Sequence, residues 1–360
     1  MRSLRFDKAA MRANLNLIKL KAGSADIIAD LSCDGQGAGL LQMAEFLRDE
    51  GLVFFAVSDP ADAISLRSNG FTEEKILILR SVTNTGMIKT LLDRNVIFTV
   101  SSYEAGIALN GVASELHTIA EARIRINTGA CRCGFLPADM DKIETIFRHM
   151  PGVAITGLYS LPAPTNILSE AEHHSEVFCS LVDSLLQQGV SIGSSVYMDY
   201  TMLLRCPSDN QTAIIEGPAI VGISPLKDNG GLKRVCQLYL SLDGMNWLSP
   251  GTFVGTDKSK VLKKPMRVAI LDAGWANGLG VSRVSDRVER GFRPFLRTLF
   301  KGVQNTVVFR VNDKKAKVLG KIGPDSVLLD VTRCECSPGD FAAAEVDPRL
   351  IHHIVVEFIE

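Results

Sequence analysis

Residues 27–39 have the sequence IIADLSCDGQGAG, an apolar run that ends at the carboxylate of Asp30 and opens into a glycine-rich turn. This pattern predicts a strand, a loop and then a helix over residues 40–50. The apolar residues up to Ala29 suit a parallel strand buried on both faces, and the glycines permit a sharp turn close to a ligand. Asp30 is therefore expected at the carboxyl end of a strand, where parallel α/β folds place their chemistry.

Strand and helix patterns alternate in short units along the first 225 residues, with no hairpin signals between them. This alternation is typical of a parallel α/β barrel or a doubly wound sheet. About eight strand candidates favour the closed form, so the sequence predicts an α/β fold whose N-terminal domain, residues 1–225, is a (β/α)8 TIM-type barrel. Further strands are expected at 53–57, 75–79, 96–100, 122–126, 154–158, 195–198 and 219–221, and further helices at 7–21, 59–69, 85–93, 102–110, 139–149 and 169–188.

The texture of the sequence changes after Pro225. Strand-like runs are separated by glycine and charged turns, with no long helix pattern between them, at residues 235–242, 267–273, 306–310, 317–322 and 327–331. Short strands without intervening helices are typical of a β domain. We therefore expect residues 226–360 to form a separate, mostly-β C-terminal domain.

Composition excludes several classes of partner. The formal net charge of −1 over 360 residues gives no electrostatic footprint for nucleic acid or for an anionic membrane surface. No apolar run approaches the ~18 residues that a membrane span needs, and residues 1–7 lack the apolar core of a signal peptide. These features predict a cytoplasmic protein. Its eight cysteines are expected to be free thiols, and the C-x-C pairs Cys131/Cys133 and Cys334/Cys336 differ from zinc-site spacing, so no metal site is predicted at the cysteines.

Four motifs in order along the chain identify a resemblance to a known family. Residues 30–37 match K-A-N-A-Y-G-H-G at Gly35 and Gly37; RINTGACRCG at 125–134, EGPAIVG at 216–222 and GWANG at 274–278 resemble K-V-D-T-G-M-x-R-x-G, P-G-I-A-L-Y-G and G-Y-A-D-G. These are motifs of the alanine racemase family, the fold-type III enzymes of pyridoxal phosphate. The resemblance covers the chain nearly end to end. It implies a barrel followed by a β domain, and a head-to-tail homodimer.

The sequence departs from the family at its catalytic positions. By the resemblance, Asp30 stands at the cofactor lysine, Thr256 at the second catalytic base, which is a tyrosine, and Arg132 at a retained arginine. An aspartate cannot form a Schiff base, because that reaction needs a nucleophilic amine. A threonine hydroxyl is also too weak an acid to replace a phenol, whose pKa is near ~10. We therefore expect no covalently bound pyridoxal phosphate.

The positions that correspond to the phosphate pocket have become acidic. Asp34 replaces a tyrosine, Asp199 and Tyr200 replace an asparagine and a serine, Glu216 replaces a proline, and Gly217 is kept. Carboxylates in this pocket would repel a phosphate dianion. These five residues are our candidates for binding a ligand.

Several functions fit such an acidic site. It can bind a small cationic or amino-acid-like ligand, or a hard metal ion, because clustered carboxylates attract either. The carboxylates can instead be solvated, or Asp30 can pair with Arg132 or Arg125 in a structural bridge. The loss of both bases favours a non-catalytic homologue that binds a ligand or a protein partner. The alternative is an amino-acid racemase that needs no cofactor and uses a thiol pair, Cys33 with Cys131 or Cys133, as its two bases.

Overall fold

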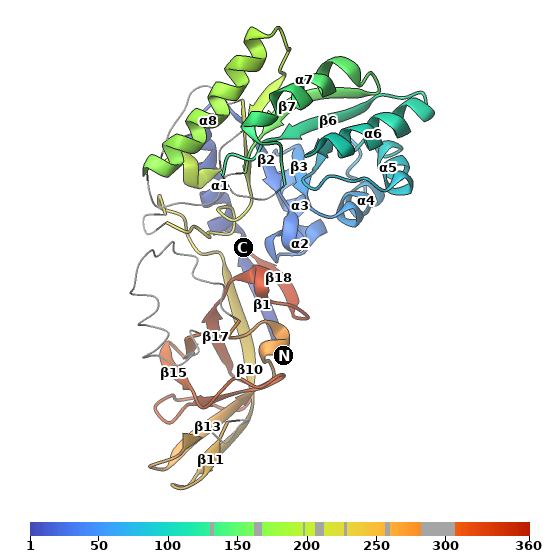
Figure 1. Cartoon of the computed structure of the whole chain (residues 1–360). Coiled ribbons are helices and arrows are strands. Elements are labelled where there is room, and N and C mark those ends of the chain that lie inside the picture. Colours follow the sequence, from blue (N-terminus) through green and yellow to red (C-terminus); the bar gives the residue numbers. More distant parts are fainter. Residues whose placement is uncertain are drawn as a thin grey trace. The chain divides into compact units, whose positions relative to one another are not determined.

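The computed structural model describes residues 1–129, 133–161, 168–196, 199–205, 212–226, 229–255, 260–281 and 307–360. The chain divides into two compact units. One unit spans Arg12–Leu232, and the other joins Met1–Met11 to Lys233–Glu360 (Figure 1).

The first unit is the predicted parallel barrel. Its eight strands are β2 (Asp26–Asp30), β3 (Phe54–Val57), β4 (Lys75–Ile78), β5 (Phe98–Val100), β6 (Ala120–Arg125), β7 (Val153–Tyr159), β8 (Ser194–Val196) and β9 (Ala213–Glu216). They pair in the orders β4-β3-β2-β9 and β5-β6-β7-β8, all parallel. A parallel bridge from Leu77 to Ile97 joins β4 to β5, and at the other seam the hydroxyls of Ser194 and Thr212 lie 2.7 Å apart. The fold class is thereby confirmed.

The barrel interior is filled by apolar side chains from strands and strand ends. Buried residues of one cluster are Ile28, Phe54, Ala56, Leu77, Leu79, Ile97, Tyr159, Val196, Ala213 and Ile215. In a barrel strand, alternate residues face inward, which is why these residues come from most of the eight strands. The barrel is therefore a packed core, and its chemistry must lie at a rim.

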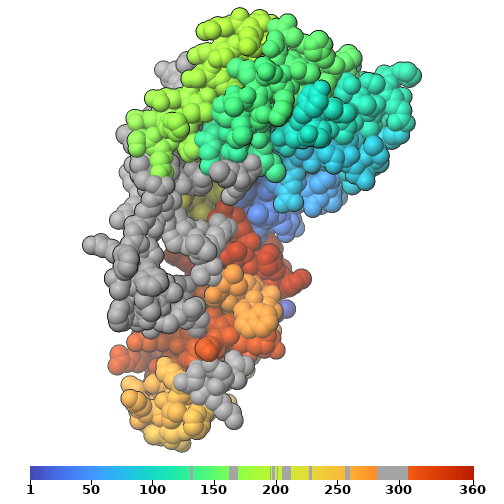
Figure 2. Space-filling model, in the orientation of Figure 1, coloured from blue at the N-terminus to red at the C-terminus, as the bar shows by residue number. Residues whose placement is uncertain are grey.

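Helices follow the strands on the outside of the barrel (Figure 1). They are α1 (Lys8–Ala22), α2 (Ser32–Gln36), α3 (Leu40–Asp49), α4 (Pro60–Ser68), α5 (Thr85–Leu92), α6 (Tyr103–Glu115), α7 (Met140–His149), α8 (Leu168–Gln187) and α9 (Tyr200–Arg205). Helices α4, α5 and α6 begin with side-chain caps, because Asp59, Asn84 and Ser102 each accept a hydrogen bond from a backbone N–H of the first turn. Figure 2 shows residues of the middle of the chain, in cyan to green, over much of the visible face of this unit.

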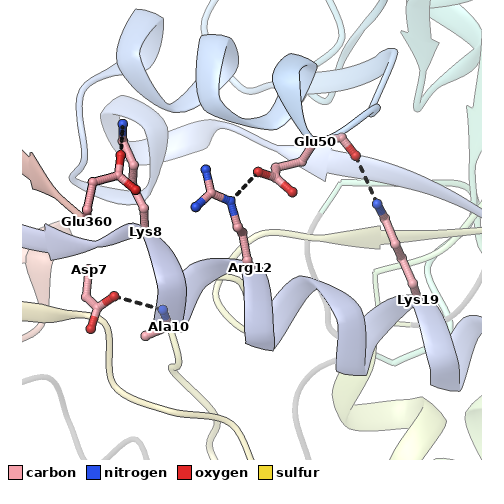
Figure 3. Close-up of polar contacts among 7 residues, drawn as sticks. All are labelled: Asp7, Lys8, Ala10, Arg12, Lys19, Glu50 and Glu360. Carbon is pink, nitrogen blue, oxygen red and sulfur yellow. Dashed lines mark hydrogen bonds and ion pairs between the residues drawn. The ribbon is translucent and has the colours of Figure 1, made fainter.

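Helix α1 is fixed by the polar contacts of Figure 3. Asp7 caps its start, where Oδ1 accepts a 2.8 Å bond from Ala10 N, and Lys8 Nζ lies 3.0 Å from Glu360 Oε1. Further along the helix, Arg12 Nε lies 2.6 Å from Glu50 Oε1 and Lys19 Nζ donates to Glu50 O at 2.9 Å. The second pair of contacts holds α1 against the end of α3.

The second unit is built on one eight-stranded sheet. Its order is β13-β16-β15-β14-β17-β10-β1-β18. The strands are β1 (Arg2–Asp7), β10 (Cys236–Leu248), β13 (Met266–Leu271), β14 (Phe309–Val311), β15 (Lys314–Val318), β16 (Val327–Asp330), β17 (Phe341–Glu345) and β18 (Val355–Ile359), beside a small hairpin of β11 (Phe253–Val254) and β12 (Lys260–Val261). The mostly-β C-terminal domain is thereby confirmed.

The first eleven residues join the β unit, whereas the sequence interpretation grouped them with the barrel. The reason is strand β1, which pairs antiparallel with β10 and parallel with β18. Its residues Leu4 and Phe6 are fully buried there. Alternating apolar and polar residues form a strand only where a partner edge is available, and that edge comes from the distant end of the chain.

The strand expected at residues 219–221 is wrong. These residues form a turn, and the eighth barrel strand is β9, which begins six residues earlier in the chain. Pro218 has no N–H to donate to a ladder, and Ala219 N donates instead to the Glu216 side chain at 2.7 Å. The strand therefore ends at Glu216, although apolar residues continue at 219–221.

Candidate functional site

The rim formed by the carboxyl ends of β2 and β9 brings several of the predicted residues together. In the parallel register, Ala29 pairs with Glu216, so Asp30 and Gly217 leave the sheet side by side. A Cβ at Gly217 would lie 2.4 Å from the carbonyl oxygen of Asp30 and 2.6 Å from Gln36 Nε2. Only glycine fits this crossing of two backbones. We call this region, residues 30–36 with 199–200 and 216–219, the barrel mouth.

Asp30 is half-buried at the end of β2. Its Oδ1 accepts a 2.9 Å bond from Ser32 N, and its carbonyl oxygen accepts a 2.9 Å bond from Gln36 Nε2. The carboxylate thus turns the chain out of the strand. This position offers no amine.

The turn after Asp30 has an unusual backbone. Cys33, Asp34, Gly35 and Gln36 have φ angles of 59°, 55°, 60° and 58°, which makes one turn of left-handed helix. A left-handed residue with a Cβ costs about 1–2 kcal/mol, so side-chain bonds must hold the turn. Asp34 Oδ1 accepts from Leu40 N at 2.8 Å, and Gln36 Nε2 also donates to Ser32 O at 3.2 Å. Asp34 is exposed, and its side chain caps the start of α3.

Gln36 was not among the predicted site residues. It is buried, with 3% of its surface exposed, and its amide oxygen Oε1 has no hydrogen-bond partner among the residues that the structure describes. A buried acceptor without a donor is costly in a protein interior. Its position between Asp30 and Gly217 makes this oxygen a candidate ligand contact. The signal in the sequence was its place in the glycine-rich turn, two residues after Asp34.

Asp199 and Tyr200 begin helix α9 as a capped turn. Asp199 is half-buried, and its Oδ1 accepts a 2.8 Å bond from Met202 N. Tyr200 is almost fully buried, and its hydroxyl donates to Gly230 O at 3.1 Å. The Tyr200 side chain therefore has a structural role in the described chain, because it is buried and its hydroxyl bonds to a backbone carbonyl.

Glu216 is the most deeply buried acid of the mouth. Its Oε2 accepts a 2.8 Å bond from Tyr200 N, and its Oε1 accepts a 2.7 Å bond from Ala219 N. Burial, followed by the negative charge of Asp199, raises the pKa of Glu216 to about 8, although bonds from the backbone of Ala219, Tyr200 and Gly217 oppose the rise. We call the N–H groups of residues 200, 217 and 219 the amide cradle.

Two arginines and a tyrosine lie in the barrel below the mouth. Arg125 Nη1 donates to Leu79 O at 3.3 Å, and the Tyr159 hydroxyl lies 2.8 Å from Thr99 Oγ1. Burial raises the pKa of Tyr159 to about 12 and lowers the pKa of Arg123, whose guanidinium lies 4.9 Å from the Phe54 ring centroid. Sequence analysis did not select Tyr159 or Arg123. The signal for both arginines was their spacing of two in a strand, which puts them on one face.

Other predicted residues are placed as follows. Thr256, Arg132 and Cys131 lie outside the described residues. Cys33 and Cys133 are free and exposed. Within the described ranges, no three His, Cys, Asp or Glu side chains gather as a metal site, and no helix is long and apolar enough to cross a membrane.

Comparison with known proteins gives a consistent set of relatives. Residues 6–201 match the family described as "Alanine racemase, N-terminal domain". The alanine racemase of Clostridium tetani (strain Massachusetts / E88) is 25% identical over 330 residues, which cover 89% of this chain and 80% of that protein. The alanine racemase of Helicobacter pylori (strain J99 / ATCC 700824) is 23% identical over 345 residues, covering 92% and 85%. Among solved structures, the alanine racemase from Streptomyces coelicolor A3(2) superposes with a TM-score of 0.85 at 18% identity, covering 100% of this chain and 98% of that one.

Proposed function

This chain belongs to the alanine racemase family, and we propose that it is a member without pyridoxal-phosphate racemase activity whose barrel mouth binds a small cationic or amino-acid-like ligand. The single observation that carries the proposal is the carboxylate of Asp30 at the end of β2. By the family resemblance, this is the position of the lysine that forms the Schiff base. A carboxylate is not a nucleophilic amine, so it cannot hold the cofactor covalently.

The pyridoxal phosphate of the family does not fit the residues of this mouth. Asp30 offers no amine, and the amide cradle already donates to Glu216 from Tyr200 and Ala219. Pro218, within the same turn, has no N–H to give to a phosphate. We therefore derive no catalytic step through this cofactor.

A cationic ligand suits the groups that the mouth offers. Asp30 is half-buried, and Gln36 donates through Nε2 to the Asp30 carbonyl while its Oε1 has no partner among the residues that the structure describes. An ammonium group carries only donors, which is the complement of a carboxylate and an amide oxygen. The ligand class of the proposal follows from this acceptor pair.

The cofactor part of the proposal is tested by an absorbance scan from ~300 to 500 nm with and without added pyridoxal phosphate, then borohydride reduction and intact mass, because a reduced Schiff base adds to a lysine. We expect a colourless protein with no mass shift and no racemisation of alanine. Asp30→Lys is the matched variant. If that variant alone gained the absorbance band, the mass adduct and racemisation, the rest of the pocket would be more complete than we propose.

The ligand part is tested by thermal shift with ethylammonium, with alanine and, as the matched anion, with acetate. We expect the cation and the amino acid to raise Tm and acetate to leave it unchanged, because only a donor group complements a carboxylate and an amide oxygen. Asp30→Asn is expected to abolish the response to ethylammonium. An equal response to acetate, or an unchanged response in Asp30→Asn, would contradict a cation site.

We also propose, from the resemblance, that the chain forms a head-to-tail homodimer, and that it is a cytoplasmic protein. A protein partner is a second kind of ligand that this proposal includes. Cysteines 33, 133, 179, 236, 334 and 336 are free, which suits a reducing compartment. Light scattering of the purified protein would give its mass in solution. A monomer at micromolar concentration would contradict the dimer.

Cofactor-independent racemisation is the second candidate function. The observation in its favour is the exposed thiol of Cys33, which the left-handed turn holds three residues after Asp30. Racemisation of alanine by the apo-protein that is lost in Cys33→Ser and kept in Cys179→Ser would favour this candidate over a binding protein.

A further inference from the structure

The buried carboxyl group of Glu216 lies in the barrel mouth but is not one of the two proposed ligand contacts, Asp30 and Gln36. It has 4% of its surface exposed, and both of its oxygens accept bonds from backbone N–H groups of two different segments. Converging N–H groups of this kind are a common way to bind an oxyanion. Here the oxygen atoms that they bind belong to the chain itself.

We propose that Glu216 keeps oxyanions out of the barrel mouth by filling the amide cradle with its own carboxyl oxygens. The two 2.7–2.8 Å bonds use the donors that an external phosphate would need. The turn after Glu216 has few others to offer. Pro218 has no N–H, and the N–H groups of Ile220, Gly222 and Ile223 donate to carbonyls of the same turn.

The geometry also explains why the carboxyl group stays in place. Gly217 lies against the Asp30 carbonyl, so the backbone that carries Glu216 is fixed by the crossing of the two strand ends. Tyr200, which supplies one N–H, is held by its own hydroxyl bond to Gly230 O. Glu216 and the Tyr200 N–H that bonds to it are thus each held by a separate contact. This inference rests on the proposed function and deepens it, because it names oxyanions as the class of ligand that the barrel mouth excludes.

The test is binding of inorganic phosphate to the full chain, measured by thermal shift and titration calorimetry against chloride at equal ionic strength. Glu216→Ala empties the cradle. We expect the variant to bind phosphate and to show a rise in Tm of about 3 °C at ten times Kd, whereas the wild type shows none. Asp199→Asn is the matched control, because it removes a neighbouring negative charge, keeps a capping side chain for α9 and leaves Glu216 in the cradle.

Three results would overturn the proposal. They are phosphate binding by the wild type, an equal gain in Asp199→Asn, and a folded Glu216→Ala that binds no phosphate. An equal gain in the control would mean that charge repulsion excludes phosphate, without any occupied cradle. If Glu216→Ala does not fold, amide exchange in the wild type decides: we expect slow exchange of the Tyr200 and Ala219 N–H groups with or without phosphate, and fast exchange of both would mean an open cradle.

These outcomes are distinct from those of the proposed function. Borohydride trapping and the ethylammonium response report on Asp30 and Gln36, whereas phosphate binding reports on Glu216. A wild type that binds phosphate but forms no lysine adduct would overturn the cradle and leave the loss of the Schiff base standing.

Discussion

The two turns that form the barrel mouth treat their polar groups in opposite ways. After β2, the chain makes a left-handed turn with exposed Asp34 and a buried amide oxygen on Gln36 that has no partner in the described part of the chain. After β9, the chain makes a turn in which both oxygens of a fully buried glutamate accept backbone N–H groups. The β2 turn therefore has an acceptor that no described residue uses, and the β9 turn uses its donors internally.

The largest expected effect concerns the charge of Glu216. Its pKa is about 8 in the folded protein, raised by burial and Asp199, against 4.5 as the ordinary value. The unfolded chain releases this proton first, so folded stability falls as pH rises from about 5 to 8 and levels off above. Glu216→Gln removes that slope. Between pH 5 and pH 8, we expect the wild type to lose up to about 4 kcal/mol of unfolding free energy relative to Glu216→Gln.

Urea unfolding of both chains at pH 5, 6, 7 and 8 would measure this difference. Asp199→Asn removes the second cause of the raised pKa, so it is expected to reduce the slope without abolishing it. A constant difference between wild type and Glu216→Gln at all four pH values would mean that Glu216 is ionised at pH 5, and the contrast between the two turns would lose its electrostatic part.

The next effect concerns the point where the two turns meet. Gly217→Ala would place a Cβ 2.4 Å from the Asp30 carbonyl, a backbone atom that cannot rotate away. Overpacking of this kind costs about 3 kcal/mol, and the crossing of β2 and β9 would separate. Denaturant unfolding measures the loss. Gly111→Ala in helix α6 is the matched control, since nothing lies within 4 Å of its new Cβ and a stability equal to or above the wild type is expected. Equal stability of the two variants would contradict the close crossing.

The sequence predicted the barrel, its helices and the acidic mouth because those features depend on local patterns. Buried strands and amphipathic helices are visible as periods of two and 3.6 residues, and the glycine-rich turn after Asp30 marks its own position. What it could not predict depends on partners distant in the chain. Strand β1 needs the edges of β10 and β18, and Glu216 became buried only because Tyr200 N and Ala219 N converge on it. Sequence analysis therefore identified the acids of the mouth but not which of them is buried against backbone N–H groups.

A smaller effect tests whether Asp34 belongs to the ligand site or to the scaffold. Asp34 Oδ1 accepts from Leu40 N at the start of α3, so Asp34→Ala is expected to cost about 1 kcal/mol of stability, as loss of a helix cap does. Asp34→Asn keeps a capping oxygen and is expected to cost only a few tenths of a kcal/mol. Thermal unfolding of the two variants gives the comparison. If Asp34→Asn lost the ethylammonium response while keeping its stability, Asp34 would also contact the ligand.

The smallest effect concerns strain in the left-handed turn. Cys33 has φ 59° and an exposed side chain, so a glycine there would lose little packing and would relieve a backbone that costs about 1–2 kcal/mol. Glycine also gains about 0.5–1 kcal/mol of freedom in the unfolded chain, and we expect a net stabilisation of about 0.5 kcal/mol. Chemical unfolding of Cys33→Gly measures it, with Cys179→Gly in helix α8 as the destabilised control. A destabilised Cys33→Gly would mean that the thiol makes a contact worth more than the strain, and the β2 turn would then be held by its cysteine as the β9 turn is held by its glutamate.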